Sequence, residues 1–160
     1  MTIEVGQSVP ETVLQVIRSG VEQVDTRALF DGRRVVLFAV PGAFTPTCSE
    51  RHLPGYVEHY DAFKKRGIEV MCVSVNDPFV MHAWGESQGV PDGLWMLADG
   101  NGDLTRALGL EMDASGYGMG LRSKRYALYA EDGIVRDLQV EAPGELRVST
   151  AENMLSRMPA

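Results

Sequence analysis

A chain of 160 residues is long enough to bury a substantial core, and we expect residues 1–160 to form a single domain. Its formal net charge of −7 argues against nucleic acid and anionic membranes as partners, because both attract basic surfaces. No apolar run approaches the roughly 20 residues of a membrane helix, and the N-terminus lacks the basic and apolar regions of a signal peptide.

The cysteines and histidines are few and scattered. Two cysteines are too few for a secreted disulfide framework and suit a reducing compartment, so we expect a cytoplasmic protein. The two cysteines and three histidines are too dispersed for a zinc site. Neither a phosphate-binding loop nor a dinucleotide-binding glycine motif is found, and we expect no metal and no cofactor.

The first half of the chain alternates strands and helices. Extra strands are expected at the front, over 11–24. Two apolar, β-branched runs at 33–40 and 68–75 predict strands that are covered on both faces. Between them, apolar residues recur at spacings of three and four, which predicts a helix over 46–66 with a kink at Pro54-Gly55.

The same alternation continues after the second of these strands. A helix is expected to begin at Asn76 or Asp77, because either residue can cap it and Pro78 suits a first helical turn. The next segments predict a strand over 94–99 and a short helix over 102–109.

The C-terminal part predicts a hairpin and a helix. Alternating strands over 124–140 meet at the turn 132–133, and a last helix over 149–155 opens with a capping box from Ser149 to Glu152. Two strand–helix–strand units, a hairpin and a helix indicate an α/β fold with a mixed central sheet flanked by helices. This is the thioredoxin order, with the extra N-terminal strands in front.

The stretch PGAFTPTCSE, at 41–50, places Cys48 at the start of a predicted helix. Thr45 can cap this helix with Pro46 in its first position, or Thr47 can cap it through a capping box. In both cases Cys48 lies in the first turn, where free N–H groups and the helix dipole favour a thiolate. The alternative is a buried, inert cysteine, but a helix start is the position that an activated thiol needs.

A thiolate alone does not make a fast enzyme, because transition-state contacts are needed as well. Thr45 offers a hydroxyl close to Cys48. Arg122 and Arg125 precede an alternating strand, and we favour Arg125 as the guanidinium that stabilises the thiolate and binds a polar substrate. His52 shares a helix face with Cys48, and we expect it to pack or hydrogen-bond near the site rather than to act as the base.

PGAFTPTCS resembles the peroxidatic motif Pro-x-x-x-Thr-x-x-Cys of the peroxiredoxins, in the form typical of the type II or peroxiredoxin 5 subfamily. Other stretches follow the type II pattern in the same order: HLPGY, CVSVNDPFVMHAW, LADGNG, ALGLEMD, GLRSKRYAL and DGIV. The resemblance runs from about residue 3 to residue 157. It implies a thioredoxin-like domain that reduces hydrogen peroxide and alkyl hydroperoxides without a cofactor.

The resemblance also implies roles for four residues: Pro41, Thr45, Cys48 and Arg125. The Cys48 thiolate would attack a peroxide oxygen and become a sulfenic acid. Thr45 and Arg125 would bind the two oxygens, and Pro41 would shield the thiolate from water.

The same resemblance suggests a substrate wall and partners. Phe44 and Phe79 are candidates for an apolar wall that accepts alkyl hydroperoxides, and the alternative for both is an ordinary core position. Glutathione, glutaredoxin or thioredoxin would be the reductant, and the protein would form a homodimer that packs beside the active-site loop.

Cys72 has two interpretations. One branch of the family, similar in MCVSVND, is often assigned a resolving cysteine at this position, whereas Val148 stands where another branch has its resolving cysteine. Cys72 equally fits a small hydrophobe in a buried strand. A Cys48–Cys72 disulfide would require the turn around Cys48 to unwind, and we favour reduction of Cys48 by an external thiol.

Two other functions fit a reactive cysteine on this fold. A thiol–disulfide oxidoreductase would carry a second cysteine at the position of Thr45. A redox sensor or chaperone-like protein would change its assembly when Cys48 is oxidised. Only a peroxidase consumes peroxide with catalytic amounts of protein.

Overall fold

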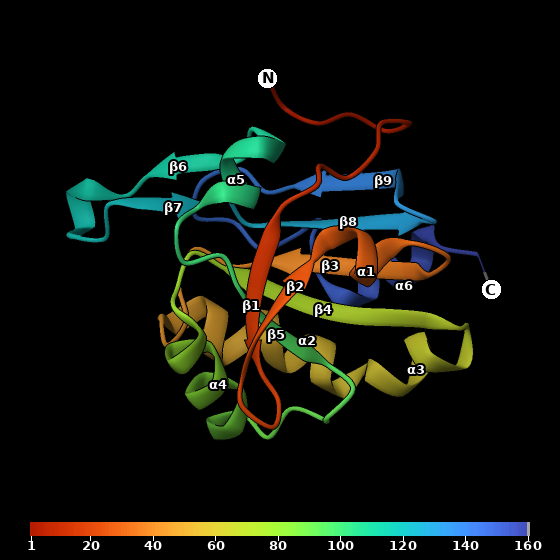
Figure 1. Cartoon of the computed structure of the whole chain (residues 1–160), viewed down its shortest axis with the longest axis horizontal. Helices are drawn as coiled ribbons and strands as arrows, with labels where there is room; N and C mark the ends of the chain where they lie inside the picture. Colours follow the sequence, from red (N-terminus) through yellow and green to blue (C-terminus); the bar gives the residue numbers. More distant parts are fainter. Residues whose placement is uncertain (160) are drawn as a thin grey trace.

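A seven-stranded mixed sheet forms the centre of the structure, a computed structural model that describes residues 1–159 (Figure 1). Its strand order is β2-β1-β5-β4-β3-β8-β9. The three central strands run parallel: β3 (Arg34–Ala39), β4 (Ile68–Ser74) and β5 (Trp95–Ala98). Antiparallel strands extend the sheet on both sides: β1 (Val13–Ile17), β2 (Val21–Asp25), β8 (Tyr126–Glu131) and β9 (Ile134–Val140).

The central strands are apolar on both faces because both faces are covered. Successive side chains point to opposite sides, so Phe38 and Cys72 face one core whereas Leu37 and Val73 face the other. Four helices contribute to the first core: α2 (Leu53–Glu58), α3 (Tyr60–Lys65), α4 (Pro78–Ser87) and α6 (Ala151–Arg157). Two contribute to the second: α1 (Thr26–Phe30) and α5 (Asp103–Leu108). The predicted α/β fold, with a mixed sheet between helices and extra N-terminal strands, is confirmed.

The helix predicted over 46–66 is interrupted twice. The turn Cys48–His52 is a π-helix in which the Leu53 N–H donates to the Cys48 carbonyl, five residues back. Pro54 explains this wider turn, since proline has no N–H and its ring crowds the carbonyl four residues earlier. A second break lies at His59, which separates α2 from α3. The helix thus changes pitch just before the expected kink at Pro54, and Cys48 opens the altered turn.

The last helix begins one residue later than the sequence indicates. Thr150, not Ser149, is its cap, because the Thr150 hydroxyl accepts the Asn153 N–H at 3.1 Å. Ser149 is buried and donates its hydroxyl to Glu141 at 2.7 Å. The capping box predicted from Ser149 is therefore wrong, and the reason is a tertiary contact with a residue eight positions earlier.

The sequence reading also missed some short elements. These are α1, the strands β6 (Glu111–Asp113) and β7 (Leu121–Ser123), and a 3₁₀ turn at Ser115–Tyr117. β6 and β7 pair with each other and project from the body as an arm, on the left in Figure 1. Three-residue strands are too short to show a periodic pattern. Within residues 1–159, no helix is both long enough and apolar enough to cross a membrane.

Candidate active site

The loop that follows β3 is anchored to the end of the neighbouring strand. The Ala43 N–H donates to the Asn76 side-chain oxygen at 3.0 Å, and the same oxygen accepts the Ser74 hydroxyl at 2.6 Å. Phe44 has φ +63°, in the left-handed region that a bulky side chain rarely adopts. The loop leading to Cys48 is thus held in a defined and locally strained path from two parallel strands.

Cys48 lies in the first helical turn, as predicted, but neither threonine caps the helix through its side chain. The Ser49 N–H donates to the Thr45 carbonyl at 3.0 Å, which sets the helix start after Thr45. The Thr45 hydroxyl donates to the Gly42 carbonyl at 2.6 Å, and Thr47 makes no capping bond. The oxygen of Thr45 keeps its lone pairs free to accept a hydrogen bond from a ligand.

Arg125 contacts the Cys48 sulfur. Its Nη2 donates to Sγ at 3.1 Å from a position directly before β8, 77 residues later in the chain. The Arg125 carbonyl in turn accepts the Glu141 N–H at 2.9 Å, which ties it to the end of β9. Cys48 is fully buried, and the Arg125 guanidinium donates directly to its sulfur.

Arg122, the other arginine considered, does not reach the sulfur. Its Nε donates to the Met119 carbonyl at 2.9 Å and its Nη1 to the Val75 carbonyl at 3.2 Å. Through these two hydrogen bonds the Arg122 guanidinium holds the arm against the loop after β4. The structure therefore brings Arg125, rather than Arg122, to the thiol.

His52 lies behind Arg125 and is 1% exposed. Its Nδ1 accepts from Arg125 Nη1 at 2.9 Å, and its Nε2 bonds the Ser149 carbonyl at 3.0 Å. Burial first, and the Arg125 charge second, lower the pKa of His52 from 6.5 to about 3. The ring is therefore neutral, and its two bonds assign the tautomer with the proton on Nε2. Because Nδ1 already accepts from Arg125, His52 orients the guanidinium and is not a base for the thiol.

Glu141 and Ser149 support His52 from the far side. The Glu141 carboxylate accepts the Ser149 hydroxyl and the N–H groups of residues 147–149, all between 2.7 and 3.0 Å. Partial burial acts to raise the pKa of Glu141, but the hydrogen bonds from Ser149 and its neighbours lower it overall. The Ser149 carbonyl also accepts the Tyr56 hydroxyl at 2.7 Å. The sequence carried no signal for Glu141, since only the fold brings the end of β9 beside this helix.

A cavity of about 410 Å³ adjoins the site. On one side it is lined by Pro41, Thr45 and Arg125, all predicted site residues. Its apolar wall comes mainly from the arm, through Met112, Ala114, Tyr117 and Met119. The structure thus gathers the four residues of the expected catalytic set at one place, three in the lining and Cys48 bonded to Arg125.

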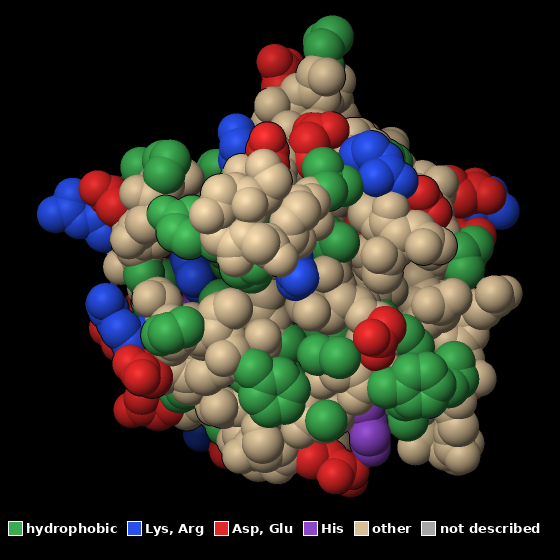
Figure 2. All heavy atoms as spheres, turned by 90° about the vertical axis from the view of Figure 1, so that its left-hand side faces the viewer, with side chains coloured by type: hydrophobic (Ala, Val, Ile, Leu, Met, Phe, Trp, Pro, Cys, Tyr) green, Lys and Arg blue, Asp and Glu red, His purple; other side chains and the backbone are tan. Residues whose placement is uncertain are grey.

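Phe44 and Phe79 do not line this cavity, contrary to expectation. Their exposed fractions are 56% and 66%, so neither is a core residue in this chain. Phe44 lies in the strained loop before Cys48, and Phe79 lies in the first turn of α4. Figure 2 looks onto the end of the molecule from which the arm projects, and apolar side chains lie scattered there among charged ones.

Cys72 is buried in β4, in the same core as Cys48, and both cysteines are free. Its register partners are Phe38 in β3 and Met96 in β5. Burial first, and then the proximity of Cys48, raise the pKa of the Cys72 thiol well above its usual value. Cys72 is therefore held as the protonated thiol, the less nucleophilic form.

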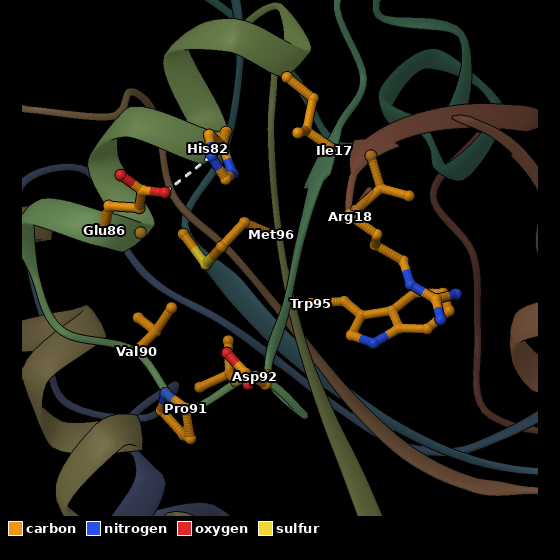
Figure 3. Close-up of a pocket in the computed structure, with 12 residues that line it drawn as sticks. Ile17, Arg18, His82, Glu86, Val90, Pro91, Asp92, Trp95 and Met96 are labelled. Carbon is orange, nitrogen blue, oxygen red and sulfur yellow. Dashed lines mark ion pairs between the residues drawn. The ribbon is translucent and has the colours of Figure 1, made fainter. Parts of the chain in front are cut away.

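Another cavity, of about 430 Å³, lies between β1, α4 and the loop before β5 (Figure 3). The Arg18 guanidinium lies over the Trp95 ring at 4.3 Å, and His82 Nε2 is 2.8 Å from a Glu86 carboxylate oxygen. None of the predicted site residues lines this cavity.

The chain is similar to known proteins along most of its length. The Redoxin family profile matches residues 4–155. "Peroxiredoxin-2E-2, chloroplastic" from Oryza sativa subsp. japonica is 48% identical and covers 98% of this chain and 73% of its own. Reduced Prx3 from Vibrio vulnificus, solved in complex with H2O2, is 50% identical, covers 98% of this chain and 99% of its own, and has a TM-score of 0.93. Peroxiredoxin 5 from Alvinella pompejana is 37% identical over 96% of each chain, with a TM-score of 0.85.

The comparisons also correct the expected location. Relatives whose names state a compartment are chloroplastic in Oryza sativa and Arabidopsis thaliana, and mitochondrial in Arabidopsis thaliana. These names contradict the prediction of a cytoplasmic protein, which is therefore wrong. It rested on a low cysteine count, which reports redox conditions and does not identify a compartment.

Proposed function

The chain belongs to the Redoxin family as a type II peroxiredoxin, a thiol-dependent peroxidase, and from this premise we propose that Cys48 is its peroxidatic cysteine. Arg125, Thr45 and Pro41 complete the site. The observation that carries the proposal is the 3.1 Å hydrogen bond from Arg125 Nη2 to the Cys48 sulfur. It joins a helix-start cysteine to a fixed positive charge beside a cavity.

In the reaction, the Cys48 thiolate attacks one oxygen of ROOH in line with the O–O bond. An S–O bond forms to the oxygen that carries the hydrogen, the O–O bond breaks, and the departing RO⁻ takes up a proton from water and leaves as ROH. Arg125 donates to the oxygens as negative charge moves onto the leaving one, and the Thr45 hydroxyl oxygen accepts from the peroxide O–H. Pro41 limits the access of water to the sulfur. The product at Cys48 is a sulfenic acid.

The apolar wall of the cavity supports alkyl hydroperoxides as substrates alongside hydrogen peroxide. Met112, Tyr117 and Met119 provide this wall, where Phe44 and Phe79 were expected. An alkyl group placed against them leaves water, which favours binding in proportion to the apolar area that it buries.

An external thiol is the proposed reductant of the sulfenic acid. Cys72 is fully buried and protonated, which makes it a poor nucleophile, and Val148 stands where another branch of the family has its cysteine. Glutathione with glutaredoxin, or thioredoxin, would supply the thiol.

A homodimer of single-domain chains is the proposed assembly. The exposed aromatic residues Phe44, Phe79 and Tyr117 are large apolar side chains that a second copy would remove from water. Light scattering should give twice the chain mass of 17.5 kDa, and the mass of one chain would contradict this assembly.

Replacement of the sulfur tests the proposed function. In Cys48→Ser the oxygen is nearly isosteric but stays protonated, so peroxide consumption should fall to background while the fold is kept. Cys72→Ser is the matched control, because it removes the other thiol and leaves the proposed nucleophile. Turnover above a few per cent of wild type in Cys48→Ser, with each of the reductants tried in turn, would show that another group reacts with peroxide.

A further inference from the structure

We propose that Met119 is a second oxidation site of this protein. Peroxides that enter the cavity convert its thioether to the sulfoxide, and the sulfoxide slows the reaction of bulky alkyl hydroperoxides at Cys48. The inference rests on the proposed function, in which peroxides enter the cavity beside Arg125 and react at Cys48.

The Met119 side chain is held against the active-site loop. It is half-buried and lines the cavity together with Met112, a residue of β6. A Cβ atom added to Gly42 would lie 2.9 Å from the Met119 Cε and 3.2 Å from the Thr45 Cγ2. The methyl groups of Met119 and Thr45 therefore border the same glycine. Arg122 fixes the Met119 backbone, since its Nε donates to the Met119 carbonyl at 2.9 Å.

The surroundings of Met119 differ from those of other methionines in the chain. Met71, Met81 and Met154 are buried in the cores, with exposed fractions of 3%, 0% and 0%. Met1 is fully exposed at the N-terminus and does not line the cavity. It reports the rate at which a thioether is oxidised in open solvent, so a comparison of Met119 with Met1 isolates the effect of the cavity.

The oxidation is a two-electron transfer that the substrate itself supplies. A sulfur lone pair attacks one oxygen of ROOH, the S–O bond of the sulfoxide forms, and the O–O bond breaks. The departing oxygen takes up the peroxide proton and leaves as ROH, so the sulfur is oxidised while the peroxide is reduced to an alcohol. Lys124 and Arg125 line the same cavity and can donate to the departing oxygen as its charge develops. Water supplies weaker donors to Met1.

Oxidation changes the wall that an alkyl group would contact. A sulfoxide is polar and chiral where the thioether was apolar and flexible. The new oxygen also has to be accommodated where the Met119 methyl packs against Gly42 and Thr45. A bulky apolar hydroperoxide loses favourable contact area, whereas hydrogen peroxide, which has no alkyl group, loses little. Methionine sulfoxide reductase would restore the thioether.

The first experiment maps oxidation in Cys48→Ser, in which the proposed nucleophile does not consume the peroxide. The protein is exposed to cumene hydroperoxide, and sulfoxide at Met119 and Met1 is followed by peptide mass spectrometry. Met119 should be oxidised about tenfold faster than Met1, the factor that one charge-assisted hydrogen bond provides. Reduced wild type serves as a second sample should the variant fold poorly. Oxidation of Met119 at the rate of Met1, or more slowly, overturns the proposal.

The second experiment measures activity before and after the same treatment, in wild type and in Met119→Leu. Over-oxidation of Cys48 affects both proteins equally, so the comparison of their after-to-before ratios isolates Met119. Wild type should lose rate with cumene hydroperoxide, keep more of its rate with hydrogen peroxide, and recover with methionine sulfoxide reductase. The same loss in Met119→Leu, or no recovery, contradicts the proposal. Failure of the proposed function would appear separately, as turnover that persists in Cys48→Ser.

Discussion

Single side chains determine the chemistry of this site through a short series of contacts. Arg125 donates to the Cys48 sulfur with one nitrogen and to His52 with another. His52 in turn bonds the Ser149 carbonyl, and Glu141 organises the loop that carries Ser149. Each of these side chains is buried or partly buried. A polar group left here without a hydrogen-bond partner would therefore destabilise the fold. In this series the neutral His52 orients Arg125 beside the proposed peroxidatic Cys48.

Arg125→Gln should lower the rate constant for peroxide by roughly 10² or more, the scale on which loss of one transition-state donor acts. The glutamine lacks both the positive charge and the second guanidinium nitrogen that bonds His52. Stopped-flow kinetics with hydrogen peroxide measures the effect. Arg18→Gln is the control, because Arg18 lies at the other cavity and should leave the rate unchanged. A wild-type rate in Arg125→Gln would mean that Arg125 does not act in the reaction.

His52→Ala should lower the peroxide rate because Arg125 loses the acceptor that orients it, and His52→Gln should recover part of that loss. A glutamine can donate through its amide nitrogen and accept through its oxygen without titrating. This rescue separates a positioning role from a base role, for which glutamine has no suitable pKa. If His52→Ala and His52→Gln react with peroxide equally slowly, the hydrogen bond to Arg125 does not explain the role of His52.

At the scale of elements, the π-turn Cys48–His52 places the thiol and the histidine on one side of the helix. Leu53 bonds the Cys48 carbonyl because Pro54 prevents the ordinary pitch at this point. The Trp84 indole N–H from α4 donates to the Ser49 hydroxyl at 2.9 Å, and the turn is thus tied to a second helix. Formation of a disulfide between Cys48 and Cys72 in β4 therefore requires these hydrogen bonds to break.

Cys72→Ser should therefore keep most of its turnover with glutathione and glutaredoxin. The reason is that a buried, protonated thiol in a central strand is a poor resolving nucleophile. Peroxide-treated wild type without added thiol should show little internal disulfide by mass spectrometry. Stoichiometric Cys48–Cys72 bonding within seconds, together with lost turnover in Cys72→Ser, would instead make this a two-cysteine enzyme.

For the whole molecule, the same buried histidine couples stability to pH. The pKa of His52 is 6.5 when exposed and about 3 in the fold, so between these values the unfolded chain binds a proton that the folded chain does not. Unfolding is then favoured by acid, and the stabilisation present above pH 6.5 is lost as the pH falls towards 3. Protonation of Glu141 destabilises the fold at lower pH, since its folded pKa is also lowered from 4.5.

The free energy of unfolding should fall by about 2 kcal/mol more in wild type than in His52→Gln between about pH 7.5 and pH 5, an upper value for one histidine. Urea titrations at a series of pH values measure this difference, and the subtraction removes the contribution of the other histidines and the carboxylates. Parallel curves for the two proteins would mean that His52 binds protons equally in the folded and unfolded states, and that its pKa is not lowered by folding.

Local sequence was sufficient to predict most of the longer elements and the helix-start position of Cys48. β-branched apolar runs specify buried strands wherever they occur, so β3, β4 and β5 were predicted almost to the residue. The helix-start position of Cys48 and the motif around it predicted the thiol, and the turn 132–133 predicted the hairpin. These features depend on neighbours in the chain.

Only the tertiary structure decided which distant groups meet at that thiol. It placed Arg125, the arginine that the sequence already favoured, at the sulfur, made His52 a neutral acceptor, and brought Glu141 and Ser149 behind it. It also showed that the arm, rather than Phe44 and Phe79, forms the apolar wall of the cavity. These contacts join segments separated by tens of residues, and their geometry follows from how the strands pair and the helices pack. The local pattern of apolar residues does not encode contacts between segments this far apart in the chain. Burial and the geometry of the hydrogen bonds are set only when the sheet is assembled.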